Sequence, residues 1–246
     1  MKTAALVVVA FLSAASSIEA QAFTEINIGS QVNANLQLYA NGANYQPGGT
    51  QLNVAGVPFG LAQAGTNANS TGIVQSPVGA ASSAPPNNTG PFDFAFSVPA
   101  GTRATVLYAL MNTAYGVYGM NEGSVVVTGT HGETATLQLI EGVNIRDHNN
   151  DDSVNSLSDP TVVPTCFLNG APTTESVQSR LDCQKLVLPA TFTGDTIAAI
   201  AFKGEANGTG GQAFLAGLTL GDTPKPTETP YALAAAALLL ALWWWR

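Results

Sequence analysis

The stretch from residue 123 to residue 141 places the strongest constraint on how this chain folds. Two strand-like runs flank His131-Gly132, and in the second run Ala135, Leu137 and Leu139 alternate with polar residues. This alternation is typical of a strand with one buried face. A two-residue connection that contains glycine is typical of a tight turn between antiparallel strands. The stretch therefore predicts a β-hairpin whose apolar face is covered by another layer.

The rest of the chain between its two ends consists of short apolar runs separated by turn residues. Phe92, Phe94 and Phe96 alternate with small or polar residues, as in a half-buried strand. Residues 104–111 are almost all apolar, which is typical of a central strand. Residues 66–91 are rich in Ser, Pro, Asn and Gly and predict a long surface loop, interrupted by one short strand at 72–75.

No ten-residue stretch outside the two ends has a convincing amphipathic helical period. About ten short strands separated by Gly- and Asn-rich turns are typical of a single all-β domain. We therefore predict an antiparallel β-sandwich, most simply jelly-roll-like, over residues 21–222.

The charge of this domain excludes one class of function. Residues 21–222 contain 14 acidic and 5 basic residues, a net charge of −9, and no basic cluster. A surface of this kind repels the phosphates of nucleic acids. We expect no nucleic-acid binding.

Residues 1–20 have the pattern of a secretory signal peptide. Lys2 precedes an apolar run, and small residues lead to Ala20 before Gln21. The run is too short to span a bilayer comfortably, and small residues before a cleavage point are typical of exported proteins. We expect the chain to be exported and the mature domain to begin at Gln21.

The other end of the chain has a two-part pattern. Residues 223–230 form a polar spacer rich in Pro and Thr, and residues 231–246 form an apolar segment that ends in three tryptophans and Arg246. As a helix, its fifteen apolar residues would extend about 22 Å, less than the roughly 30 Å of a hydrocarbon core. We predict a hydrophobic helix that either anchors the protein in a membrane or is cut by a processing enzyme.

Spacer, apolar segment and terminal basic residue resemble the C-terminal sorting signals of bacterial PEP-CTERM proteins. The sequence departs from that pattern because Pro226-Thr-Glu-Thr-Pro230 stands where Pro-Glu-Pro is expected. Small residues near Gly221-Asp222-Thr223, a short spacer and an apolar tail equally resemble a eukaryotic GPI signal. In that setting Asn69, Asn87 and Asn207 would be glycosylation acceptors. Either resemblance implies a protein held at, or released from, the outside of a membrane.

Short segments along the domain carry a second resemblance. They include Asn33-Ala-Asn-Leu36, Gly56-Val-Pro-Phe59, Tyr108-Ala-Leu-Met-Asn112, Glu141-Gly-Val-Asn-Ile-Arg-Asp-His148 and Phe214-Leu-Ala-Gly217. These segments resemble an uncharacterised exported domain of PEP-CTERM-type proteins. The strand layout is also similar to galactose-binding-like sandwiches such as NPCBM modules. The resemblance implies carbohydrate binding or attachment to a cell surface.

Cys166 and Cys183 are the two cysteines of the chain. In an exported protein such a pair usually forms a disulfide. Closing this loop would contribute about 3 kcal/mol to stability. The alternative is a pair of buried free thiols. From the compartment we predict the disulfide.

Residues 141–152 contain the densest run of oxygen-bearing side chains. Asp147, Asn149 and Asp151 stand at the first, third and fifth positions of a calcium loop, and Asp159 is placed to complete an irregular site. The remaining positions do not follow the EF-hand pattern. A solvated polar loop is the alternative. Ca²⁺ is the one cofactor that the sequence suggests.

The same segment offers little for catalysis. The only histidines are His148 and His131, too few for a three-histidine zinc site, and no nucleophile motif is present. We interpret Arg146 as an arginine held by the carboxylates of Glu141 and Asp182 that orders the loop around it. We predict no enzymatic activity. The alternative is a carbohydrate-active hydrolase that uses the acidic residues of this segment.

Tyr115 and Tyr118, in a glycine-flanked loop over 112–123, are the best candidates for an exposed binding face. The alternative is that both rings pack within their own loop. Taken together, the sequence predicts a non-enzymatic cell-surface or extracellular-matrix protein that binds or adheres, with carbohydrate as a candidate ligand. A purely structural matrix component is the remaining alternative.

Overall fold

The computed structural model describes residues 21–38, 45–65, 71–76, 93–149, 156–168, 170–173, 179–205 and 211–222. From Ala22 onward they belong to one compact unit, Ala22–Thr223. The predicted signal peptide, spacer and apolar C-terminal segment lie outside the described residues. Among the residues that are described, no helix is long and apolar enough to cross a membrane.

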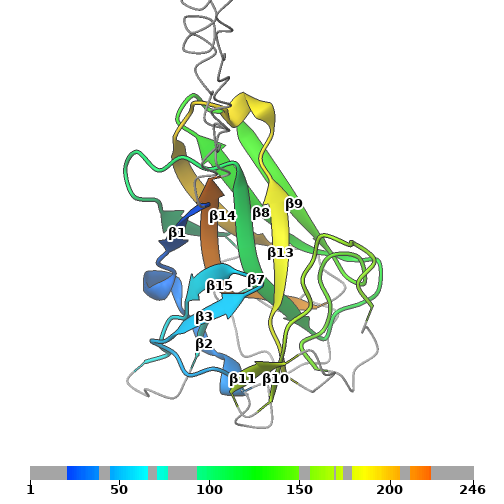
Figure 1. Ribbon diagram of the computed structural model, residues 1–246. Coiled ribbons are helices and arrows are strands. Elements are labelled where there is room, and N and C mark those ends of the chain that lie inside the picture. Colours follow the sequence, from blue (N-terminus) through cyan, green and yellow to red (C-terminus); the bar gives the residue numbers. More distant parts are fainter. Residues whose placement is uncertain are drawn as a thin grey trace, which may run out of the picture. The chain divides into compact units, whose positions relative to one another are not determined.

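A six-stranded antiparallel sheet forms the centre of this unit (Figure 1). Its strand order is β13-β7-β15-β5-β2, and β1 also pairs with β15. The two long central strands, β7 and β15, pair from Gln212 opposite Ala114 to Gly221 opposite Val106. The six strands are β1 (Ala22–Ile26), β2 (Ala34–Asn35), β5 (Gly72–Gln75), β7 (Val106–Ala114), β13 (Asp182–Val187) and β15 (Gln212–Asp222).

Both faces of this sheet are buried, which explains the long apolar runs in its sequence. Every residue of β15 from Gln212 to Gly221 is buried. A β-bulge between Leu215 and Gly217 adds one residue to the strand, so that Leu215 and Leu218 face the same core although they are three residues apart.

A four-stranded antiparallel sheet of order β6-β14-β8-β9 covers one face. Its strands are β6 (Asp93–Ser97), β8 (Asn121–Gly129), β9 (Thr134–Ile140) and β14 (Ile197–Gly204). Alternate residues of β6 and β9 are buried, as their sequence pattern predicts. Phe94, Leu137 and Phe202 of this sheet pack with Leu107 and Leu218 of the central sheet in one core. Over the residues that the structure describes, the prediction of an all-β domain with antiparallel sheets is confirmed.

The opposite face of the central sheet packs against a second apolar cluster. Phe214 and Leu110 of the central strands belong to it, together with Leu52, Phe59 and Phe167. The covering elements are the hairpin β3 (Gln51–Val54) and β4 (Val57–Gly60), and a small sheet of β10 (Cys166–Leu168), β11 (Ala171–Thr173) and β12 (Ser179–Arg180). Helical residues in the described part of the chain form three short 3₁₀ turns, η1 (Gly29–Gln31), η2 (Leu36–Leu38) and η3 (Ala190–Phe192).

The predicted hairpin is formed by β8 and β9, which pair from Thr128 opposite Thr134 onward. Its connection is longer than the predicted two-residue turn. The backbone N–H of Thr130 bonds to the carbonyl of Thr196, 2.9 Å away, and therefore leaves the hairpin ladder. Gly132 has a φ of 90°, the left-handed conformation that glycine adopts without strain.

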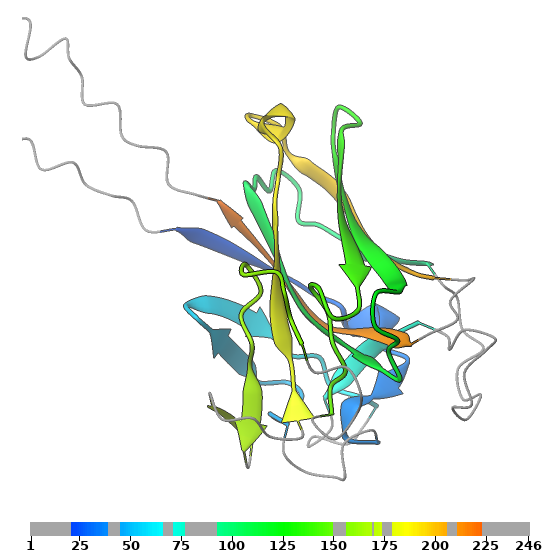
Figure 2. The same cartoon turned by 90° about the vertical axis from the view of Figure 1, so that its right-hand side faces the viewer.

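The two ends of the described domain lie side by side. Ala22 pairs with Asp222 through the antiparallel contact of β1 and β15, seen as the blue and orange strands in Figure 2. The chain therefore enters and leaves the domain at the same end of the central sheet.

Candidate functional site

Four of the seven large apolar side chains that are exposed in the described part of the chain lie on the loop that connects β7 to β8, which we call the aromatic loop (residues 115–120). Its Tyr115, Val117, Tyr118 and Met120 side chains are 48%, 45%, 68% and 36% exposed. In the described part of the chain, the other large apolar side chains that are exposed lie elsewhere: Val163, Leu168 and Val187. Four exposed apolar side chains on one short loop make it a candidate surface for contact with another molecule.

Hydrogen bonds to the segment after β9 fix the backbone of the aromatic loop. The N–H of Gly119 donates to the carbonyl of Glu141 at 2.9 Å, and the N–H of Glu141 donates to the carbonyl of Met120 at 2.9 Å. Tyr115 has a φ of 62°, and its N–H donates to Asp147 Oδ2 at 2.8 Å. That bond holds a conformation that is uncommon for a tyrosine.

The ring of Tyr118 rests on the backbone of Gly142. A Cβ built on Gly142 would lie 2.4 Å from Tyr118 Cδ2, so any side chain at that position would displace the ring. Gly142 also has a φ of 80°, which favours glycine. One side of the ring is therefore seated on the protein, and much of the rest faces solvent.

The carboxyl group of Glu141 lies buried beneath the aromatic loop. Its residue has no exposed surface, and Thr113 Oγ1 donates to Oε2 at 2.8 Å, while Oε1 has no hydrogen-bond partner. Burial raises the pKa of Glu141 to about 9, and the nearby carboxylates of Glu122 and Asp147 add to the shift. Glu141 is therefore a neutral carboxylic acid at neutral pH.

Close packing of glycines makes room for this carboxyl group. A Cβ built on Gly116 would lie 2.2 Å from Glu141 Cδ, and one built on Gly211 would lie 2.7 Å from Gly116 Cα. Glu122, the first buried residue of β8, accepts a hydrogen bond from the N–H of Val117 at 3.4 Å, and burial raises its pKa. The loop thus sits on two buried carboxyl groups.

The segment that carries Asp147 continues the edge of β7 beyond the point where β13 begins. Thr113 and Asp147 form a parallel bridge, in which the N–H of His148 donates to the carbonyl of Thr113 at 2.8 Å. Asp147 Oδ1 accepts from the N–H of Asn149 at 2.7 Å, while its Oδ2 holds the aromatic loop. Both carboxylate oxygens therefore bind backbone.

Of the other residues of the predicted calcium site, Asp159 accepts hydrogen bonds from the N–H and hydroxyl of Thr161 at 2.8 and 2.7 Å. Asp151 lies outside the described residues. The calcium site stays a prediction.

Arg146 and Asp182 form a bidentate ion pair. Arg146 Nε donates to Asp182 Oδ2 at 2.7 Å, and Nη2 donates to Oδ1 at 2.9 Å. Asp182 is fully buried and also accepts from Asn112 Nδ2 at 2.9 Å and from the N–H of Thr165 at 3.0 Å. The pair therefore ties the 141–148 segment to the start of β13, as a structural arginine does.

His148 belongs to a buried network that the sequence did not suggest. Tyr45 Oη lies 3.2 Å from His148 Nδ1 and donates to the carbonyl of Arg180 at 3.3 Å. Arg180 Nη1 donates to the carbonyl of Asp147 at 3.3 Å. Burial, with the positive charge of Arg180, lowers the pKa of His148 to about 4. The imidazole is neutral at neutral pH and holds the segment in place.

Cys166 and Cys183 are free, buried thiols, so the prediction of a disulfide between them is wrong. Cys183 forms an antiparallel bridge with Val163, whereas Cys166 lies opposite Arg180. The two cysteines are thus offset by three residues, which is about 10 Å along a strand. A disulfide requires Cα atoms within about 7 Å. The strand register keeps the thiols apart.

The remaining predicted site residues, Asn69, Asn87 and Asn207, lie outside the described residues. The sequence singled out Tyr115 and Tyr118 but missed Glu122 and Arg180. Glu122 and Arg180 matter because their side chains are buried, and no local sequence motif indicates that burial.

Comparison of the chain with protein-family models, with curated proteins and with solved structures found no match.

Proposed function

We propose that this protein is an exported, non-enzymatic binding module of the cell surface or extracellular matrix, and that it binds carbohydrate through the aromatic loop. The observation that carries the proposal is the exposure of Tyr115 and Tyr118 on a loop with a fixed backbone. A tyrosine offers a flat apolar ring with a polar hydroxyl, which suits the C–H face and the hydroxyl groups of a sugar. A preorganised loop also loses little conformational entropy on binding.

The position of the aromatic loop supports display on a surface. The loop follows Ala114, which pairs with Gln212 at the start of β15, whereas Ala22 pairs with Asp222 at the end of β15. The eleven residues of β15 span about 33 Å. A domain attached through its ends would present the aromatic loop at the far end of the central sheet.

We propose further that the domain is a jelly-roll-like sandwich of the PEP-CTERM-associated kind, and that residues 231–246 anchor it or are removed by a processing enzyme. Mass spectrometry of the protein recovered from its native envelope gives the test. A mature C-terminus before residue 231 supports processing, and a lipid-bearing C-terminus near Asp222 supports the GPI route. An intact chain that is free in the medium contradicts both.

The hydrolase alternative has less support. With its pKa raised to about 9, Glu141 is protonated at neutral pH, as a general acid must be. Its side chain, however, has no exposed surface from which to reach a glycosidic oxygen. Asp147 binds two backbone N–H groups. The contacts of both carboxyl groups are those of side chains that support the aromatic loop.

The test is a glycan array with the full-length chain in detergent, followed by titration of the strongest binder. We expect Tyr118→Ala to weaken binding at least about tenfold and Tyr118→Phe to retain most of it. Val187→Ala is the matched control, because Val187 is 65% exposed on β13. Equal binding by Tyr118→Ala and the native chain contradicts the assignment of the loop, and absence of any binder favours the purely structural alternative.

A further inference from the structure

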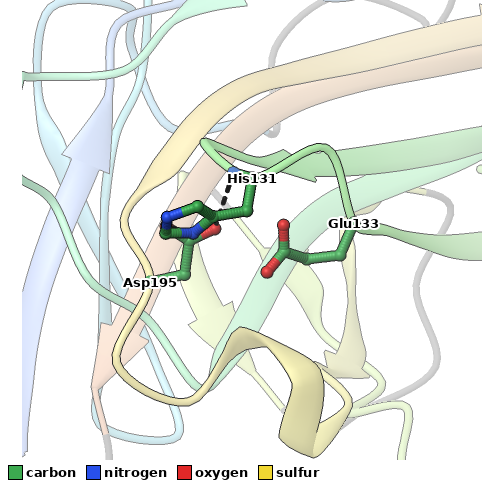
Figure 3. Close-up of side chains that lie close together, drawn as sticks. All are labelled: His131, Glu133 and Asp195. Atoms are coloured by element: carbon green, nitrogen blue, oxygen red, sulfur yellow. Dashed lines mark hydrogen bonds and ion pairs between the residues drawn. The ribbon is translucent and has the colours of Figure 1, made fainter.

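A second cluster of polar side chains lies at the hairpin turn between β8 and β9. His131 and Glu133 come from the turn itself, and Asp195 comes from the loop between η3 and β14 (Figure 3). One ligand atom from each of the three side chains lies within 4.8 Å of the others. In the described part of the chain this is the one group of three or more His, Cys, Asp or Glu side chains so placed.

The Asp195 carboxylate anchors the cluster. Its side chain is 4% exposed, and its oxygens accept hydrogen bonds from the Thr130 hydroxyl, the N–H of Thr196 at 2.7 Å and the N–H of His131 at 3.2 Å. The bond from Thr130, with those from the backbone, holds the pKa of Asp195 below its usual range. His131 Nδ1 lies 2.9 Å from Asp195 Oδ1, while the ring remains 79% exposed.

Glu133 supplies the observation that points to a ligand. Its Oε2 atom is buried and has no hydrogen-bond partner in the protein, while the residue as a whole is half-buried. A Cβ built on Gly129 would lie 3.0 Å from this oxygen and 2.4 Å from Asp195 Oδ2, so both carboxylates converge on the same glycine. Figure 3 shows the Glu133 carboxylate turned toward the other two side chains. A cation placed there would lie between two neighbouring carboxylates and offset their mutual repulsion.

We propose that His131, Glu133 and Asp195 bind a divalent transition-metal ion of the Zn²⁺ class. One imidazole nitrogen and two carboxylate oxygens are ligands that Zn²⁺ accepts, and the exposed side of His131 leaves a further position for water. Tetrahedral ligands at about 2.1 Å from Zn²⁺ lie about 3.4 Å apart, so the three ligand atoms, now within 4.8 Å of one another, would have to draw together around the ion. Ca²⁺ fits poorly because it requires six or more oxygen ligands.

The ion would join the hairpin turn to the loop before β14, and β14 already pairs with β8. It would therefore stabilise the folded state by binding it in preference to the unfolded chain. The aromatic loop lies at the other end of β8, so this site is independent of the proposed carbohydrate site.

The test measures metal binding by the full-length chain in detergent, after dialysis against EDTA. We expect one equivalent of Zn²⁺ to bind and raise the unfolding temperature, Co²⁺ to give visible d–d bands, and Ca²⁺ and Mg²⁺ to do neither. His131→Ala and Glu133→Gln should each weaken Zn²⁺ binding at least about tenfold. Asp93→Asn, which removes an exposed carboxylate from β6 of the same sheet, should leave it unchanged.

Unfolding of each variant in EDTA separates lost binding from lost folding, because His131→Ala also removes the ion pair with Asp195. Glu133→Gln keeps that pair and the shape of the side chain. If Zn²⁺ does not raise the unfolding temperature of the native chain, the proposal is overturned. It is also overturned if both variants keep the full rise in unfolding temperature. Binding that only Asp93→Asn weakens would place the ion elsewhere.

Discussion

Gly116 lies directly against the carboxyl group of Glu141. A Cβ at position 116 would be 2.2 Å from Glu141 Cδ and 2.4 Å from each carboxyl oxygen. Glu141 cannot swing outward, because it is fully buried and accepts a hydrogen bond from Thr113. The loop that presents Tyr115 and Tyr118 therefore rests on a side chain that must stay in place.

Replacement of Gly116 with alanine should overpack this contact. We expect Gly116→Ala to lower the free energy of unfolding by about 1–3 kcal/mol, measured by urea denaturation. The double variant Gly116→Ala/Glu141→Ala should lose less than the sum of the two single variants, because removal of the carboxyl group opens the space. Strict additivity of the two changes would contradict the contact.

The protonated state of Glu141 predicts a pH dependence of stability. Its pKa is raised from 4.5 to about 9 in the folded state. Between these values the folded protein holds a proton that the unfolded chain has lost, so stability falls as pH rises through this window. The slope contributed by one such group is at most about 1.4 kcal/mol per pH unit.

The neutral analogue Glu141→Gln removes that titration. We expect it to be more stable than the native chain at pH 8 and to lose the advantage toward pH 5, as measured by urea denaturation across this range. An unchanged difference between the two proteins at pH 5 and pH 8 would sink the assignment of a raised pKa.

Sequence patterns predicted the elements whose signal is local. The alternation in Thr134–Ile140 predicted the hairpin strand β9, and the apolar run at 104–111 predicted the central strand β7. For these two strands, alternation and apolar runs along the chain carry the information. Tyr115 and Tyr118 are exposed, and their role in binding stays a prediction. Of the two carboxylates expected to hold Arg146, that of Asp182 pairs with it, whereas the Glu141 carboxyl accepts a hydrogen bond from Thr113.

Contacts between distant segments could not be predicted in this way. Tyr45 and His148 are 103 residues apart, and only the fold brings their side chains together. The same is true of His131 and Asp195, which are 64 residues apart. Neither pair has a spacing or a motif that distinguishes it from ordinary polar residues.

The ion pair of Arg146 and Asp182 should be essential for stability. Asp182→Asn leaves a cation without its partner in a site where Arg146 is 12% exposed and Asp182 is not exposed at all. We expect a loss of about 3–5 kcal/mol in the free energy of unfolding. Arg146→Lys should also destabilise the protein, because an ammonium group cannot make the bidentate contact. Arg103→Gln, on the exposed surface, should change stability by less than about 0.5 kcal/mol.

The register of the strands predicts the chemistry of the two cysteines. Cys166 is opposite Arg180 and Cys183 is opposite Val163, so the native fold holds the two thiols apart. Both are buried, and burial raises the pKa of Cys183 to about 12, so little of this thiol is ionised at neutral pH. Because the thiolate is the reactive form, we expect the folded protein to react slowly with a thiol reagent.

When the same protein is denatured without reductant, two thiols per chain should react with the reagent. A reductant should leave its unfolding temperature unchanged, because there is no bond to cleave. If the denatured, unreduced protein instead has no reactive thiol and its unfolding temperature falls on reduction, a disulfide is present. The register of β10 and β12 would then differ from the one described, since the present pairing leaves about 10 Å along the strands between the two positions.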